Sequence, residues 1–250
     1  KRVTKKNKVL ISDTVNPMYY KVIQTYAWAN EIELEMFDKM PENVSDYAGV
    51  VIQNPNFYGE IKEIVKPEGA LLIVITDVSS LALLTPPQEY GADIVVGDIQ
   101  TLGIPMSFGG PHAGFMSCTE KLMRQLPGRL AGKTVDVDGN TAYTLTIQTR
   151  EQHIKREKAT SNICSNQALI ALCSTLYLSL LGEKGFKQAS YLSSKNAHDL
   201  AKKLEQKGYK VLSKDFYNEF QLLGLFLYLS RAYFLLEHFP LHHKYTNHWQ

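Results

Sequence analysis

The stretch GADIVVGDIQTLGIPMSFGGPHAGF, residues 91–115, decides the fold class of this chain. Its apolar run at 94–97 predicts a short buried strand, and a glycine-rich loop follows. A strand that runs into such a loop positions reactive groups in many α/β enzymes. The stretch nevertheless contains no lysine, arginine or cysteine, and His112 is its one strongly basic candidate. The loop therefore has the form of an active-site loop without an evident reactive residue.

Apolar runs on either side of this stretch predict further strands, and stretches with helical spacing lie between them. Strands that alternate with helices at such intervals predict an α/β fold, a mostly parallel sheet flanked by helices. The expected strands are 8–12, 32–37, 47–53, 70–75, 94–97 and 115–116, and the expected helices are 18–29, 60–66, 79–84 and 119–126, the last with Thr119 as its N-cap.

The second half of the chain predicts a different pattern. Residues 127–149 form a long excursion with a hairpin turn at Val-Asp-Gly-Asn, and a strand is expected at 210–213. Two long helices are expected between them, at about 165–181 and 184–207, with Gly182 and Gly208 at their C-terminal ends. The apolar part of the first helix, 168–182, is too short and too rich in serine and threonine for a membrane span, so we expect it to be buried.

The composition is that of an ordinary soluble globular protein, with 44% hydrophobic and 21% charged residues and a net charge of +2. The basic run KRVTKKNK at 1–8 is interpreted as a solvated segment rather than a nucleic-acid arm. Cys118, Cys164 and Cys173 have no metal-ligand spacing, so reduced thiols in a cytoplasmic protein are expected. No metal, nucleic acid or membrane is expected as a partner.

Two loops carry candidate site residues at the predicted carboxyl edge of the sheet. Gly109, Gly110 and His112 belong to the glycine-rich loop, which either approaches an anion or a partner chain or simply makes a tight turn. Asn54 and Asn56 follow the strand at 47–53, at the edge where open α/β sheets bind ligands.

Asp77 ends the next buried strand at the same edge. It is expected either to pair with a protonated ring nitrogen or to cap the short helix that follows.

The dense polar run TREQHIKREKATSN, residues 149–162, is a further candidate site. Arg150 and its basic neighbours, with Thr160, Ser161 and Asn162, have the chemistry to bind a carboxylate or phosphate at the N-terminus of the next helix. The alternative is a solvated loop that ends in an ordinary N-cap. The residues alone do not decide between the two.

The last thirty residues differ in character from the rest. From residue 221 onward the chain holds one acidic residue, Glu237, and four of its seven histidines, at 238, 242, 243 and 248. A metal-binding histidine cluster and a membrane-surface helix are two interpretations. We favour a third, that 221–250 is not a native continuation of the fold, for example because of a reading-frame shift, since His242 and His243 lack the i, i+4 spacing of a helical zinc site.

Three runs taken together resemble the glycine cleavage system P protein family, in its amino-terminal half or separate subunit 1. They are NPNFYGE (54–60), the stretch at 91–115, and REKATSNICSNQAL (156–169). The likeness extends from about residue 8 to about residue 219. Whole subunit 1 chains of this family are longer, so we expect a middle fragment. Asn16 stands where the family is expected to have histidine.

The resemblance implies the large domain of the aspartate-aminotransferase-like fold, fold type I of the pyridoxal phosphate (PLP) enzymes. Residues 1–185 are expected to form this domain, incomplete at its N-terminus, and 186–220 to begin the small domain. The catalytic half of the family carries its Schiff-base lysine in a run like LHKTF-IP. Laid against IQTLGIP at 99–105, that run places Gln100 at the lysine position, and a glutamine amide cannot form the aldimine.

The resemblance also implies a function, a PLP-lysine-lacking subunit of glycine decarboxylase, the glycine dehydrogenase of the glycine cleavage system. Its expected partners are subunit 2, which would bind PLP, the lipoyl-bearing H protein, and glycine as the substrate of the complex. One alternative is an independent PLP enzyme that uses another lysine, with Lys133 and Lys158 as candidates. The other is a fragment with no function.

Overall fold

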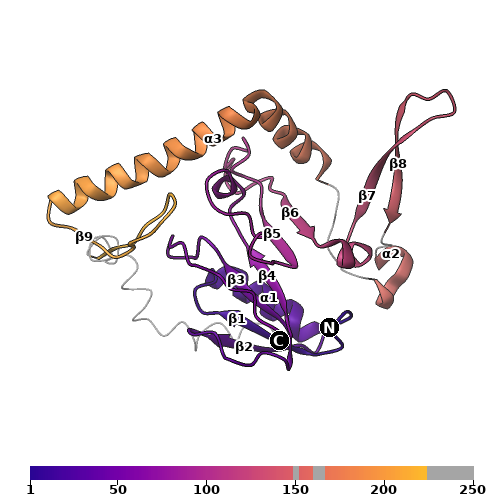
Figure 1. Ribbon diagram of the computed structural model, residues 1–250, viewed down its shortest axis with the longest axis horizontal. Coiled ribbons are helices and arrows are strands. Elements are labelled where there is room, and N and C mark those ends of the chain that lie inside the picture. The colour runs from indigo at the N-terminus through magenta and orange to yellow at the C-terminus, as the bar shows by residue number, and fades with distance from the viewer. Residues whose placement is uncertain (149–151, 160–166, 224–250) are drawn as a thin grey trace.

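The computed structural model describes residues 1–148, 152–159 and 167–223 (Figure 1). Its centre is a six-stranded sheet in the order β2-β1-β3-β4-β5-β6. The first five strands of that order are parallel, and β6 runs antiparallel to β5. The predicted, mostly parallel sheet is confirmed. The strands are β1 (Lys8–Ser12), β2 (Glu33–Phe37), β3 (Tyr47–Gln53), β4 (Leu71–Ile75), β5 (Ile94–Asp98) and β6 (Gly114–Cys118).

The core of the domain lies on the central strands. Ile11, Val50, Leu72 and Val74 are fully shielded from solvent, with exposed fractions of 0%. Consecutive residues of β3, from Ala48 to Val51, are all buried, as expected for a strand covered on both faces. The continuous apolar runs in the sequence therefore identified the central strands correctly.

Helices connect the strands, and most lie where the sequence predicts them. Helix α1 (Pro17–Ala29) begins with Asn16 as its N-cap, whose side chain accepts a hydrogen bond from the Met18 amide. The expected helices at 79–84 and 119–126 are short 3₁₀ helices, η1 (Val78–Ala82) and η2 (Glu120–Gln125). Thr119 stands at the N-cap of η2 but makes no side-chain capping bond.

The helix predicted at 60–66 is wrong, because this segment has no helical structure. Its backbone donors go to other parts of the chain instead of to its own carbonyls. The Ile61 amide donates to the carbonyl of Asp215, and the Lys62 amide donates to Oδ1 of Asn54. The segment is thus held by long-range contacts that helical spacing does not reveal.

The expected excursion after the sheet is a β-hairpin that projects from the body of the domain (Figure 1). Strands β7 (Arg129–Val135) and β8 (Thr141–Gln148) pair antiparallel, and the predicted turn is confirmed, with Gly139 at a φ of 81°. A short helix α2 (Gln152–Lys155) and a 3₁₀ helix η3 (Arg156–Lys158) follow.

The predicted pair of long helices is confirmed as the two arms of α3 (Ala168–Gln206). Gly182, at φ 59° and ψ −174°, breaks the helical path between the arms, and Gly208 follows the end of α3 at a φ of 88°. The chain then forms β9 (Lys210–Val211), paired with β10 (Leu222–Leu223). The predicted strand at 210–213 is therefore shorter than expected, and β10 lies within the segment expected to be an atypical tail.

The expectation that 168–182 is a buried helix is wrong. One side of this arm does pack on the domain, since Ile170 belongs to a core cluster with Ile99, Leu102 and Ile104. The other side is bare: Leu169 is 71% exposed and Leu180 is 86% exposed. The sequence is apolar on nearly all sides of the arm, but the described chain covers only one of them.

Candidate functional site

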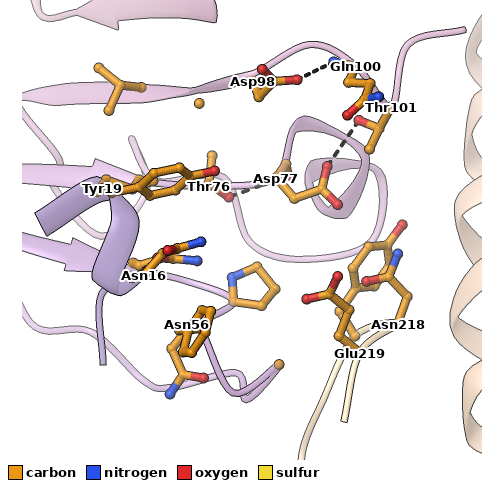
Figure 2. Close-up of a pocket in the computed structure, with 18 of the residues that line it drawn as sticks. Asn16, Tyr19, Asn56, Thr76, Asp77, Asp98, Gln100, Thr101, Asn218 and Glu219 are labelled. Atoms are coloured by element: carbon orange, nitrogen blue, oxygen red, sulfur yellow. Dashed lines mark hydrogen bonds between the residues drawn. The ribbon is translucent and has the colours of Figure 1, made fainter. Parts of the chain in front are cut away.

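A cavity of about 920 Å³ opens at the carboxyl ends of β3, β4 and β5. Its walls come from the N-terminal turns of α1, the loop after β3, the ends of β4 and β5, and a segment after β9 (Figure 2). This is the edge at which open α/β sheets bind ligands. The polar and charged residues that line it are Asn16, Tyr19, Gln53, Asn56, Thr76, Asp77, Asp98, Gln100, Thr101, His112, Tyr217, Asn218 and Glu219.

Asn54 and Asn56 order the loop after β3 from within. The Asn54 side chain donates to the carbonyl of Lys62 and accepts from its amide. Asn56 is 2% exposed, and its Oδ1 accepts from the amides of Tyr58 and Glu60. Asn56 lines the cavity, but the polar atoms of both side chains are committed to the loop.

Asp77 is the hub of a hydrogen-bond network at the cavity wall. Its carboxylate accepts from the amide and the hydroxyl of Ser79, each at 2.9 Å, and from the Thr101 hydroxyl at 3.1 Å. The Ser79 hydroxyl also lies 3.1 Å from the Tyr217 hydroxyl. Asp77 therefore caps η1 and ties it to the loop after β5 and to Tyr217, as the capping interpretation anticipated.

Replacing Asp77 by alanine is expected to lower the free energy of unfolding by about 1–2 kcal/mol, because it removes the cap of η1 and the hydrogen bonds from the Ser79 and Thr101 hydroxyls. Urea denaturation followed by circular dichroism measures the change. The matched control is Asp46→Ala, at an exposed position, which should change stability by less than about 0.5 kcal/mol. Equal stability of the two variants would contradict the network's role.

Gln100 lines the cavity directly after β5. The backbone N–H of Gln100 donates a hydrogen bond of 2.6 Å to Oδ1 of Asp98, and this bond fixes the turn from the strand into the loop. No lysine lines the cavity within the described residues. Lys133 lies in β7 and Lys158 in η3, and neither is among the lining residues. The side chains present do not fit a covalently held PLP.

The glycine-rich loop brings His112, but not its glycine pair, to the cavity. The amides of Gly109 and Gly110 both donate to the Met106 carbonyl, at 2.8 and 3.2 Å. Gly109 has a φ of 108°, which favours glycine. The pair therefore makes a tight turn, and these two amides are not free to bind an anion.

Thr160, Ser161 and Asn162, together with Arg150, lie outside the described residues. Their expected anion site stays a prediction. Within the described ranges, no group of three or more histidine, cysteine, aspartate or glutamate residues is arranged to hold a metal ion. Cys118 and Cys173 are free thiols, and Cys164 lies outside these ranges.

The charged residues of the cavity wall are predominantly acidic. Asp77, Asp98 and Glu219 line it, whereas no described lysine or arginine does. The Tyr19 phenol lines the same cavity. Its pKa is raised above the ordinary value, first by burial and then by the carboxylates of Asp98, Glu219 and Asp77.

Sequence reasoning missed the wall formed by Tyr217, Asn218 and Glu219. This segment docks on the loop after β3: the Tyr217 amide donates to the Gly59 carbonyl, and the Ser213 hydroxyl donates to the Tyr58 carbonyl. Behind it, the His198 ring stacks on Phe216 at 3.9 Å between centroids. No local signal in the sequence indicates this long-range docking.

Comparisons with known proteins identify relatives over most of the chain. The family model described as glycine cleavage system P-protein matches residues 1–227. Probable glycine dehydrogenase (decarboxylating) subunit 1 of Listeria monocytogenes serotype 4a is 47% identical over 234 residues, 87% of this chain and 52% of the relative. The Carboxydothermus hydrogenoformans protein of the same name is 46% identical, over 87% of this chain and 53% of its own. The chain thus spans about half the length of these relatives.

Solved structures agree on the fold. An inhibitor-bound glycine decarboxylase (P-protein) superposes with a TM-score of 0.82 at 42% identity, over 88% of this chain and 54% of that chain. An aspartate aminotransferase from Thermus thermophilus gives 0.59 at 16% identity, over 93% of this chain and 67% of that chain, which bears on the fold alone. Another neighbour of this fold, with a TM-score of 0.55 at 12% identity over 91% of this chain and 66% of its own, has glycine covalently linked to its PLP cofactor. The expected aspartate-aminotransferase-like fold is confirmed.

Proposed function

Because this chain belongs to the glycine cleavage system P-protein family, we propose that it is a subunit of a glycine decarboxylase that lacks the cofactor lysine. The assembled enzyme would take glycine, release its carboxyl group as carbon dioxide and pass the aminomethyl group to the lipoyl arm of the H protein. A companion subunit would hold the PLP, which supplies the electron sink for that reaction. A cytoplasmic location is part of this proposal.

The observation that carries the proposal is Gln100 in the cavity wall. It lies two residues after the end of β5, at the position where the resemblance places the cofactor lysine, and no described lysine lines the cavity in its place. An amide nitrogen is not a nucleophile at neutral pH, so the described cavity cannot bind the cofactor covalently. A supporting role beside a catalytic subunit explains why this chain has the fold of the family but lacks the cofactor lysine.

The bare side of α3 supports a companion subunit. Residues 168–182 contain no charged side chain, and a helix that is apolar on nearly all sides is normally buried. Leu169, Leu172, Leu176 and Leu180, spaced three or four residues apart, are nevertheless 71%, 53%, 54% and 86% exposed. We name these four residues the leucine stripe. An exposed apolar stripe of this kind marks a protein interface.

A membrane is the other environment for such a helix. Among the described residues, α3 alone is long and apolar enough to cross one by length and composition. The arm 168–181 spans only about 21 Å, however, less than the ~30 Å of a hydrocarbon core. Gly182 breaks the helical path, and Glu183, Lys184 and Lys187 follow at once. The leucine stripe is therefore assigned to a protein partner.

Two measurements on the full chain test this function. The chain mixed with PLP is expected to show no aldimine absorbance, and glycine decarboxylation with H protein is expected only after a PLP-loaded companion subunit is added. An aldimine band that disappears in Lys133→Ala or Lys158→Ala would establish an independent PLP enzyme instead. A chain that leaves the activity of the companion subunit unchanged would be a fragment without function.

A further inference from the structure

We propose that the cavity is a binding site for a small organic cation, a protonated amine or a guanidinium, and that it rejects phosphate esters. This goes beyond the proposed subunit role and rests on the cavity of this chain. PLP, the ligand that the fold implies, carries a phosphate, so the proposed selectivity is opposite in charge.

The cavity itself defines the site. Its volume of about 920 Å³ lies within the range of small-molecule pockets, roughly 300–1,000 Å³, and it opens at the carboxyl edge of a parallel sheet. Segments distant in sequence line it, namely the N-terminal turns of α1, the loop after β3, the ends of β4 and β5, and residues 217–219 (Figure 2). The carboxylates do not define the site. They decide the charge of its ligand.

Those carboxylates reach the cavity from different elements, Asp77 after β4, Asp98 at the end of β5, and Glu219 from the segment opposite them (Figure 2). Asp77 is committed to Ser79 and Thr101, so the other two are the residues available to a ligand. Among the described residues, the Asp98 carboxylate accepts only the backbone amide of Gln100, and neither Asp98 nor Glu219 forms an ion pair with a described lysine or arginine.

The remaining walls suit a cation as well. Tyr19 and Phe57 supply exposed aromatic rings, and the faces of such rings attract ammonium and guanidinium groups. The side-chain oxygens of Asn16 and Gln53 each accept one backbone amide, from Met18 and from Asn16, and each keeps a second lone pair that can accept an N–H group of the ligand. A phosphate would instead meet three carboxylates, with His112 as the only basic side chain among the described lining residues.

Calorimetric titration of the full chain tests the proposal, with ethylguanidinium and ethylammonium as cationic probes and methyl phosphate and PLP as anionic probes. Saturable binding is expected for the cations and not for the phosphates. Asp98→Asn and Glu219→Gln are each expected to weaken cation binding roughly 3- to 10-fold, the effect of removing one unit charge near the ligand at an intermediate dielectric. Glu63→Gln, an exposed carboxylate outside the lining, is the matched control and should bind as the parent chain does.

Three results would overturn the proposal: no cation binding, phosphate binding of equal or greater strength, or unchanged cation binding in both lining variants. Circular dichroism of each variant verifies the fold. A repeat with companion subunit present separates two sources of the cation, since a side chain of that subunit would displace the probes and a free metabolite would not. Association of the subunits without cation binding would leave the proposed function intact and refute this inference alone.

Discussion

Replacing Leu172 and Leu176 together by aspartate is expected to abolish co-purification of this chain with its companion subunit. Both side chains are about half exposed and lie in the middle of the leucine stripe, so the isolated chain should tolerate the change. In an apolar interface, two unpaired carboxylates carry desolvation costs of several kcal/mol. A loss of affinity of more than about 100-fold is expected, measured by biolayer interferometry with immobilised companion subunit.

The second arm of α3 provides the matched control. Leu192 and Leu200 are 44% and 52% exposed, and aspartate at these two positions places the same charges on the same helix beyond Gly182. This control variant is expected to keep at least about a third of the parent affinity, as is usual for substitutions outside an energetic centre. Equal loss in both variants would show that the stripe does not define the interface.

The parts of the fold that the sequence predicts are those governed by local pattern. The strand β3 was predictable because its residues are apolar without alternation, which requires burial on both faces. The break at Gly182 was predictable because glycine alone adopts a positive φ easily. Residues 60–66 have helical spacing but form no helix, because their backbone amides donate to Asp215 and Asn54. The local sequence pattern gives no information about those distant partners.

The same distinction holds for the site. Asn56 and Asp77 were identified because the carboxyl ends of parallel strands meet at one edge, so positions in sequence translate into positions in space. Gln100 was identified from the resemblance to the lysine-bearing run of the family. Tyr19 and Glu219 were missed since their place depends on how α1 and the segment after β9 dock. The acidic character of the cavity depends partly on Glu219, so it could not be predicted from the sequence.

Replacing Gly59 by alanine is expected to detach the segment 215–219 and open the cavity. Gly59 has a φ of 80°, and an added Cβ would lie within 2.5 Å of the Glu219 carbonyl carbon and closer still to its oxygen. The backbones of Gly59 and Glu219 would have to move apart, which would strain the hydrogen bond from the Tyr217 amide to the Gly59 carbonyl. The free energy of unfolding should fall by about 2–4 kcal/mol, and amide exchange in 215–219 should accelerate at least about tenfold.

The control variant Gly208→Ala distinguishes the steric clash of an added Cβ from the cost of a positive φ at a non-glycine residue. Gly208 has a φ of 88°, but an added Cβ there meets no atom within 4 Å, so only the conformational cost of about 1 kcal/mol applies. Urea denaturation compares the two variants, and hydrogen exchange with mass spectrometry locates the effect. If Gly59→Ala destabilised the chain no more than Gly208→Ala and left exchange in 215–219 unchanged, the segment would not be a fixed wall. Because Glu219 moves with that wall, Gly59→Ala should also weaken ethylguanidinium binding at least as much as Glu219→Gln does.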